Sequence, residues 1–242
     1  MRTIIIVCCL AIFVAFLCGD SHAKLLMADT FDGKLNGSFW TGQKASWNVK
    51  NDVLEIHRLE GDGNGAEDFG YGKIEFDDFG LQLDFQLLVD PFPSKIEILF
   101  RAKEFHFYQL ILTPANGAGR KNSARWYKRE GDDRGTWNEF IEFRTEFPFP
   151  VETDTWYTIA LLGNGFDFQL FIKKQGELKF QKVSEWSDPK KLHKKGTLGF
   201  HTNQLQHYLV DNVILHDTSA AINLAVEPQG KLAVTWGSLK AK

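Results

Sequence analysis

Cysteine is absent from residues 19–242. The three cysteines of the chain, Cys8, Cys9 and Cys18, all lie close to the N-terminus. The remainder has no thiol with which to form a disulfide, so a hydrophobic core must hold it together. An excess of charge of one sign is also lacking, since the net charge of the 242-residue chain is −3. Such a balance argues against nucleic acid or an anionic membrane as the partner.

Long apolar runs are lacking too, apart from one near the N-terminus, and the sequence predicts no membrane span. That run, residues 4–17, follows Met1-Arg2-Thr3 and precedes Ser21-His22-Ala23. A positive start, a short apolar run and small residues after it are typical of a secretory signal peptide. We therefore predict that residues 1–23 are removed by cleavage after Ala23 and that the protein is secreted or periplasmic. Acylation of Cys18, as in a lipoprotein, is the alternative.

The motifs of several enzyme classes are absent. The chain contains no P-loop, no Gly-x-Ser-x-Gly elbow and no dinucleotide-binding fingerprint. His106, His201 and His207 are not spaced like zinc ligands on one element, so a zinc hydrolase is not predicted. The function has to be inferred from the faces of the predicted fold.

The pattern that is present is a short-range alternation of apolar and polar residues. Between Phe79 and Leu87 every odd position is apolar, which predicts a strand with one face on a core and one in water. Similar runs recur, separated by turn signals of which Gly163-Asn164-Gly165 is the sharpest, and no convincing amphipathic helix interrupts them. The predicted strands are 46–49, 53–57, 73–76, 79–88, 96–101, 107–112, 125–129, 139–143, 156–162, 166–173, 178–183, 197–200 and 208–215.

Many short strands without helices predict an all-β sandwich or barrel. The 21 Phe, 7 Trp and 5 Tyr residues suit a large core of this kind. We expect a single antiparallel domain over residues 24–217 and a C-terminal tail over 218–242 with a short strand at 231–236. A sorting or anchoring signal is the alternative for the tail.

Several phrases follow one another as they do in a known family of sandwiches. Asp29-Thr-Phe-Asp-Gly33 and Trp47-Asn-Val-Lys-Asn-Asp-Val-Leu54 resemble the opening of concanavalin A-like lectin/glucanase (jelly-roll) domains. Later phrases in the same order are Phe76-Asp-Asp-Phe79, Ile98-Leu-Phe-Arg101, Phe107-Tyr-Gln-Leu110, Thr155-Trp-Tyr157, Gly196-Thr-Leu-Gly-Phe200 and Val210-Asp-Asn-Val213. The resemblance covers about residues 29–217. Within the superfamily the chain is most similar to 3-keto-disaccharide hydrolase-type domains and laminin-G-like sugar-binding domains.

The resemblance implies an antiparallel jelly-roll β-sandwich that binds sugars on its concave sheet. Two departures concern catalysis. Glu75-Phe-Asp77 lacks the third carboxylate of the Glu-x-Asp-x-(x)-Glu strand of family-16 glucanases, so their retaining chemistry is not expected there. Ser94-Lys-Ile96 stands where the hydrolase-type domains read Asn-Ser-Gly, which argues against their activity.

Candidate ligand-binding residues fall on two strands that the resemblance assigns to the concave sheet. If Ile98 and Phe100 face the core, Glu97 and Arg101 face outward. The guanidinium of Arg101 suits sugar hydroxyls or a carboxylate, while a surface ion pair with Glu97 is the alternative. On the next strand Gln109 is expected beside Arg101, where its amide can contact a sugar.

Three further candidates come from the loops and the later strands. Trp126 and Trp137 flank the charged stretch 128–134 and can offer flat faces to a sugar, with burial in the core as the alternative. His201 falls where hydrolase-type domains carry a polar residue on the concave sheet. If the protein is an enzyme, Glu97 and His201 are its candidate acid or base.

The resemblance also implies a structural Ca²⁺ where the first and last strands meet, with Asp29 and Asp211 as the matching carboxylates. Two solvated aspartates are the alternative, and no cofactor is otherwise required. The prediction is an exported domain that binds a carbohydrate on its concave sheet. A hydrolase of 3-keto-disaccharides or related glycosides and a structural envelope or matrix domain are the competing predictions.

Overall fold

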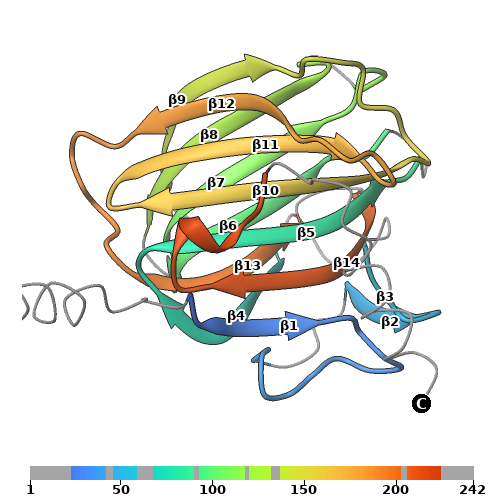
Figure 1. The fold of residues 1–242 in the computed structure, drawn as a ribbon, viewed down its shortest axis with the longest axis horizontal. Coiled ribbons are helices and arrows are strands. Elements are labelled where there is room, and N and C mark those ends of the chain that lie inside the picture. Colours follow the sequence, from blue (N-terminus) through green and yellow to red (C-terminus); the bar gives the residue numbers. More distant parts are fainter. Residues whose placement is uncertain are drawn as a thin grey trace, which may run out of the picture.

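Two β-sheets stacked face to face make up the protein (Figure 1). The computed structural model describes residues 23–41, 46–58, 68–89, 93–117, 120–131, 137–202 and 206–224. Predictions about residues 1–22 and 225–242, which include the signal peptide and the strand at 231–236, lie outside the described residues. The described elements are β1 (Leu25–Asp29), β2 (Trp47–Lys50), β3 (Val53–His57), β4 (Asp68–Phe76), β5 (Phe79–Leu87), β6 (Ile96–Lys103), β7 (His106–Thr113), β8 (Ser123–Gly131), β9 (Trp137–Glu146), β10 (Trp156–Asn164), β11 (Asp167–Lys174), β12 (Gln181–Ser187), β13 (Gly196–Thr202), β14 (His207–His216) and the short 3-10 helix η1 (Ser219–Ala221).

All strand pairs are antiparallel, and they form one eight-stranded and one six-stranded sheet. The eight-stranded sheet has the order β12-β11-β10-β5-β14-β3-β2, with β1 paired to the second half of β14. The six-stranded sheet has the order β4-β13-β6-β7-β8-β9. Strands far apart in the sequence, such as β5 and β14, are neighbours in one sheet, and the chain passes repeatedly from one sheet to the other. This topology confirms the predicted jelly-roll sandwich.

The alternation in the sequence decides which side chains fill the space between the sheets. The odd positions of β5, from Phe79 to Leu87, are buried in the core. Burial of each such side chain contributes about 1.5–3 kcal/mol of transfer free energy. At the centre, the ring of Phe100 lies 5.2–6.1 Å from three other aromatic rings, those of Tyr108, Trp126 and Phe168. Among the described residues no helix has the length and apolar character that a membrane crossing requires.

Three strands differ clearly from the sequence prediction, and one of them is β4, which starts at Asp68 and not at residue 73. β1 was not among the predicted strands, because its sequence, Leu-Leu-Met-Ala-Asp, does not alternate. It forms by pairing with β14, where Asp29 lies opposite Val213. β12 starts at Gln181 and not at residue 178, and Leu178 is 53% exposed in the connection after β11. Tertiary pairing, and not local pattern, sets these boundaries.

The predicted hairpin of β10 and β11 is present, but its turn lies later than the predicted Gly163-Asn164-Gly165, because Gly163 and Asn164 are the last residues of β10. Asn164 pairs with Asp167, so the loop consists of Gly165 and Phe166. Gly165 has φ +57°, and glycine at the first central position is typical of a type II′ turn. Its N–H donates to Asp78 Oδ1 at 2.7 Å, which ties this turn to the one between β4 and β5.

Candidate functional site

The outer face of the six-stranded sheet, turned away from the core, carries three of the predicted site residues. Glu97 on β6, Gln109 on β7 and His201 on β13 each alternate with core residues and so point away from the core. The structure brings all three into contact. Their side chains are nevertheless buried, with exposures of 0% for Glu97 and His201 and 1% for Gln109.

Four side chains surround the carboxylate of Glu97, and together with it they are called the Glu97 cluster. Oε2 lies 2.6 Å from His201 Nδ1 and accepts a hydrogen bond from Gln109 Nε2. Oε1 accepts a hydrogen bond from Gln206 Nε2 at 2.8 Å and lies 2.6 Å from Lys95 Nζ. Gln109 Oε1 has no hydrogen-bond partner in the described structure. A buried acceptor without a partner carries a desolvation cost.

The electrostatics of the cluster keep Glu97 ionised. Burial by itself would raise the pKa of Glu97, but His201 and then Lys95 outweigh it through charge and hydrogen bonds. The pKa of the carboxyl therefore lies well below its ordinary value, and at neutral pH Glu97 can only accept hydrogen bonds. The acid of a glycoside hydrolase needs a raised pKa instead. Glu97 is thus suited to recognition or to orienting His201, and not to proton donation.

Aromatic rings cover the β4 end of this face. The ring of Phe69 stacks on His201, with centroids 4.3 Å apart and planes inclined by 8°. It also lies 6.1 Å from Tyr71 and 5.7 Å from Phe107. The guanidinium of Arg129 lies over Phe69 and Phe107 at 6.0 and 5.7 Å, within cation–π range. This end of the face is a packed secondary core.

Arginines gather at the other end, around the hydroxyl of Tyr127. Arg125 Nη1 and Arg120 Nη1 donate to Tyr127 Oη at 2.8 and 2.9 Å. Arg144 lies directly opposite Arg125 in the ladder of β8 and β9. Arg120, Arg125 and Arg144 are called the arginine cluster.

The three members of the arginine cluster have no acidic partner in the part of the chain that the structure describes. Within the described part of the chain, none of the three arginines forms an ion pair. Arg125 is only 8% exposed, and its Nε has no hydrogen-bond partner there. Like charges in direct cross-strand register repel each other, so an anion bound here would relieve that repulsion.

Sequence reasoning missed this end of the face. A signal was available, because Trp126 is a core residue and its neighbours Arg125 and Tyr127 must then face away from the core. Arg120 precedes β8 and has no periodic signal, so only the structure brings it to Tyr127.

Arg101 does not lie on this face, contrary to the prediction. The ladder of β6 and β7 has a β-bulge between Phe100 and Lys103. Arg101 lies in it with φ +49°. The bulge breaks the alternation and turns the side chain toward one end of the core. A Cβ at Gly196 would lie 2.3 Å from the carbonyl carbon of Arg101, so the close approach of β13 to the bulge requires glycine there.

The contacts of Arg101 are structural. Its guanidinium is 1% exposed and donates to the carbonyl oxygens of Asp77 and His193 at 2.9 and 3.3 Å. It lies 5.1–5.9 Å from three aromatic rings, those of Phe79, Phe166 and Phe168. Among the described residues its ion-pair partner is Asp78 and not Glu97, and its burial leaves almost no surface for a sugar contact.

The prediction that a tryptophan contacts the sugar can be checked for only one of the two candidates. Trp126 is fully buried in the main core, and its Nε1 donates to Ser184 Oγ at 2.9 Å, so it offers no face to a ligand. Trp137 begins β9 opposite Gly131, and its side chain lies outside the described residues.

The predicted calcium ligands lie on opposite faces of the eight-stranded sheet. Asp29 points to the core side, where it accepts hydrogen bonds from Trp40 Nε1 at 2.7 Å and from the N–H of Phe31 at 3.0 Å. Asp211 lies opposite Asp84 on the outer face. The two carboxylates therefore do not converge on one position.

Comparison with known proteins places the fold. No family model and no curated protein match the chain. Among solved structures it is similar to the carbohydrate-binding module CBM66 from Bacillus subtilis, with 13% identity, 73% of this chain and 94% of that chain covered, and a TM-score of 0.55. It is similar to a Bacillus subtilis protein of unknown function with a galectin-like fold, with 14% identity, 81% of this chain and 98% of that chain covered, and a TM-score of 0.57. It is also similar to the exoplasmic/lumenal domain of VIP36 in its Ca²⁺/Man3GlcNAc-bound form, with 10% identity, 86% of this chain and 93% of that chain covered, and a TM-score of 0.56.

The chain therefore has the concanavalin A-like jelly-roll fold that its sequence phrases predict. Likeness at this level of identity establishes the fold alone. The narrower similarity to 3-keto-disaccharide hydrolase-type and laminin-G-like domains stays a prediction.

Proposed function

We propose that this protein is an exported carbohydrate-binding domain that binds an acidic glycan on the outer face of its six-stranded sheet. The observation that carries the proposal is the arginine cluster, in which a buried Arg125 and its neighbours have no carboxylate partner among the described residues. The Glu97 cluster lies beside it, since Gln109 pairs with Tyr127 in the ladder. The cations of the arginine cluster thus lie beside a buried polar network.

The chemistry favours a uronic acid or a sulfated sugar. Guanidinium groups bind carboxylate and sulfate-like oxyanions through paired N–H donors. The exposed side chains of Arg120 and Arg144 can also donate to sugar hydroxyls, whereas Glu97 and Gln109 are buried and bonded to each other. The names of two structural neighbours, a carbohydrate-binding module and the Man3GlcNAc-bound form of the VIP36 exoplasmic/lumenal domain, support a sugar as the ligand class.

Titration calorimetry on the folded protein tests the proposal, with a uronic-acid oligosaccharide and its neutral counterpart as probes. We expect the acidic probe to bind and Arg125→Gln to weaken it about 10- to 100-fold, since a hydrogen bond to a charged group contributes about 1.5–3 kcal/mol. Lys174→Gln removes the same charge from an exposed end of β11 and should leave binding unchanged. Equal binding by wild type and Arg125→Gln would contradict the acidic class.

A hydrolase remains the second candidate, on the strength of one contact. The carboxylate of Glu97 lies 2.6 Å from His201 Nδ1, an arrangement that orients an imidazole as a base. Turnover of a bound glycan that is lost in His201→Ala while binding persists would support it. Absence of binding to any glycan by folded protein would favour the structural envelope or matrix domain.

A structural Ca²⁺ also stays a proposal. Another solved structure similar to this chain is the Ca²⁺-bound form of VIP36. Since Asp29 and Asp211 do not converge, each would need other ligands. A melting temperature that does not change between excess Ca²⁺ and chelator would contradict this proposal.

A further inference from the structure

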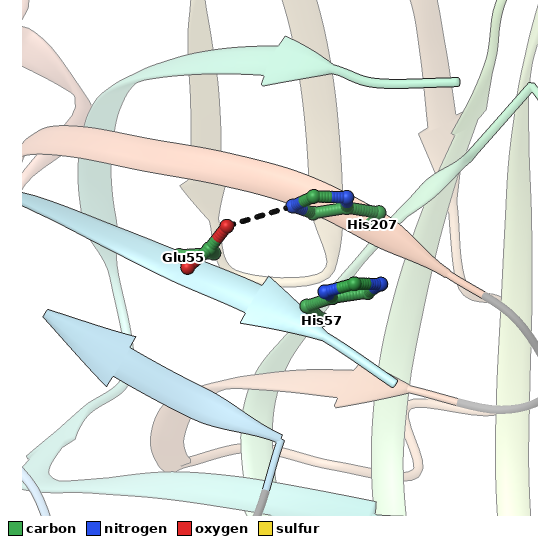
Figure 2. A group of neighbouring side chains, drawn as sticks. All are labelled: Glu55, His57 and His207. Atoms are coloured by element: carbon green, nitrogen blue, oxygen red, sulfur yellow. Dashed lines mark hydrogen bonds and ion pairs between the residues drawn. The ribbon is translucent and has the colours of Figure 1, made fainter. Parts of the chain in front are cut away.

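Three side chains able to hold a metal ion meet on the outer face of the eight-stranded sheet. Glu55 and His57 lie two residues apart on β3 and alternate with core residues, so both point away from the core. His207 on β14 lies directly opposite His57 in the ladder. Figure 2 shows the two imidazole rings side by side, with Glu55 reaching from β3 toward the ring of His207.

The geometry of the three groups is close to that of a metal site. Their potential ligand atoms lie within 4.8 Å of one another. His207 Nε2 is 2.9 Å from Glu55 Oε1, and the rings of His57 and His207 are 3.8 Å apart with planes inclined by 7°. The side chains of His207 and Glu55 are 13% and 21% exposed, so an ion can reach them from solvent.

We propose that Glu55, His57 and His207 form a Zn²⁺ site with further coordination positions open to water. Imidazole nitrogen and carboxylate oxygen are ligands that Zn²⁺ prefers, whereas Ca²⁺ and Mg²⁺ take oxygen ligands. Bonds of about 2.0–2.2 Å separate the ligand atoms of a tetrahedral site by about 3.3 Å. The nitrogen lone pairs lie in the ring planes, so one of the two stacked imidazoles has to turn out of the stack for all three groups to reach one ion.

The backbone around the site is held on both strands. The N–H of His57 donates to the carbonyl oxygen of Ser46 at 2.8 Å, and the N–H of His207 donates to Ser94 Oγ at 2.9 Å. Ligands on fixed strands give a more precise site than ligands on loops.

The site also lies next to the Glu97 cluster along the chain. Gln206, which precedes His207, donates to Glu97 Oε1 at 2.8 Å. A Zn²⁺ ion on His207 would hold the first residue of β14, directly after Gln206, which is one of the donors of the Glu97 cluster. The ion would thus stabilise the fold near the proposed glycan site without contacting the glycan.

Titration calorimetry with ZnCl₂ on the metal-free, full-length folded chain tests the site. We expect one Zn²⁺ per chain. Substitution of a direct ligand, in His57→Ala or His207→Ala, should weaken binding by more than the roughly 10–100-fold that follows loss of a residue that only hydrogen-bonds to a ligand. Glu55→Gln should weaken it less, because both imidazoles remain. His106→Ala, which removes an exposed histidine of β7, is the matched control and should bind as wild type does.

A measurement on the unsubstituted protein avoids dependence on how the variants fold. One equivalent of Zn²⁺ should shift the ring signals of His57 and His207 in the NMR spectrum and leave those of His106 in place. Failure of folded wild type to bind Zn²⁺, or shifts confined to other histidines, would overturn the proposal. Glycan binding measured in parallel tests the other face separately, since folded His57→Ala should keep it.

Discussion

Single side chains fix the ends of the core. Arg101 closes one end by donating to two carbonyl oxygens under three phenylalanine rings. Lys128 and Asp188 form a second buried contact at 3.0 Å. Such groups are costly to bury, so removal of one partner leaves the other without compensation. Their substitution should therefore change stability far more than ligand binding.

Arg101→Met should lower the free energy of unfolding by about 1–3 kcal/mol, because two buried carbonyl oxygens lose their donor while most of the packing remains. Urea unfolding measures the change, with Lys103→Met at the exposed end of β6 as the control. Glycan affinity should not change. A folded Arg101→Met that has lost glycan binding would restore Arg101 as a ligand residue.

Glu97 should make stability depend on pH in the acidic range. Because its pKa is lowered in the folded state, its contribution is fully present above the ordinary value of 4.5 and is lost as pH falls toward the folded pKa. Between pH 5 and pH 3 wild type should therefore lose more stability than Glu97→Gln, which has no such titration. Urea unfolding at both pH values measures the free energy of unfolding. Equal losses of that free energy in the two proteins would show that the pKa of Glu97 is not lowered.

At the scale of elements, tight turns and bulges set the register of the strands. The turn at Gly165 is joined to the turn at Asp78, and the bulge at Arg101 lies against Gly196. Both depend on a backbone conformation with positive φ, at Gly165 itself and at Arg101. Substitutions in this turn or this bulge should therefore affect the stability of the whole hairpin or strand.

Gly165→Ala should destabilise the fold by about 1 kcal/mol, since alanine tolerates φ +57° poorly although no neighbouring atom would clash with its Cβ. Gly37→Ala is the control, because Gly37 also has open space around it but no positive φ. Thermal unfolding compares the two variants. Equal melting temperatures would mean that the turn does not require glycine.

At the scale of the whole molecule, the sandwich begins immediately after the predicted cleavage point. β1 starts at Leu25, and the backbone nitrogen of Lys24 donates to Asp217 Oδ1 at 2.8 Å. Cleavage after Ala23 would turn this nitrogen into a charged amine beside a carboxylate, and every described strand would be kept.

Mass spectrometry of extracytoplasmic protein should therefore find an N-terminus at Lys24. Asp217→Asn should lower stability in the processed protein by at most about 1 kcal/mol, the usual contribution of an exposed ion pair. Recovery of exported protein that still carries Met1 would contradict the signal-peptide hypothesis.

The sequence by itself determined the faces of the strands. The period-two alternation in β5, β6 and β7 places Phe79, Ile98 and Leu110 in the core and Glu97 and Gln109 opposite it, because successive strand residues point to opposite sides. The order of short phrases determined the jelly roll. The site was predictable as far as this alternation holds, which placed Glu97 and Gln109 away from the core. The expected neighbour of Gln109 was wrong, since it lies opposite Leu99 and contacts Glu97 and not Arg101.

Only the tertiary structure decided which strands are neighbours and where the alternation breaks. The bulge at Arg101 reversed its face, since one extra residue shifts every later side chain to the other side. Glu55 and His207 are 152 residues apart and meet only because β3 pairs with β14. Arg125 and Arg144 meet through the register of β8 and β9. Cross-strand contacts depend on register and on burial over the whole sandwich, which no local pattern encodes.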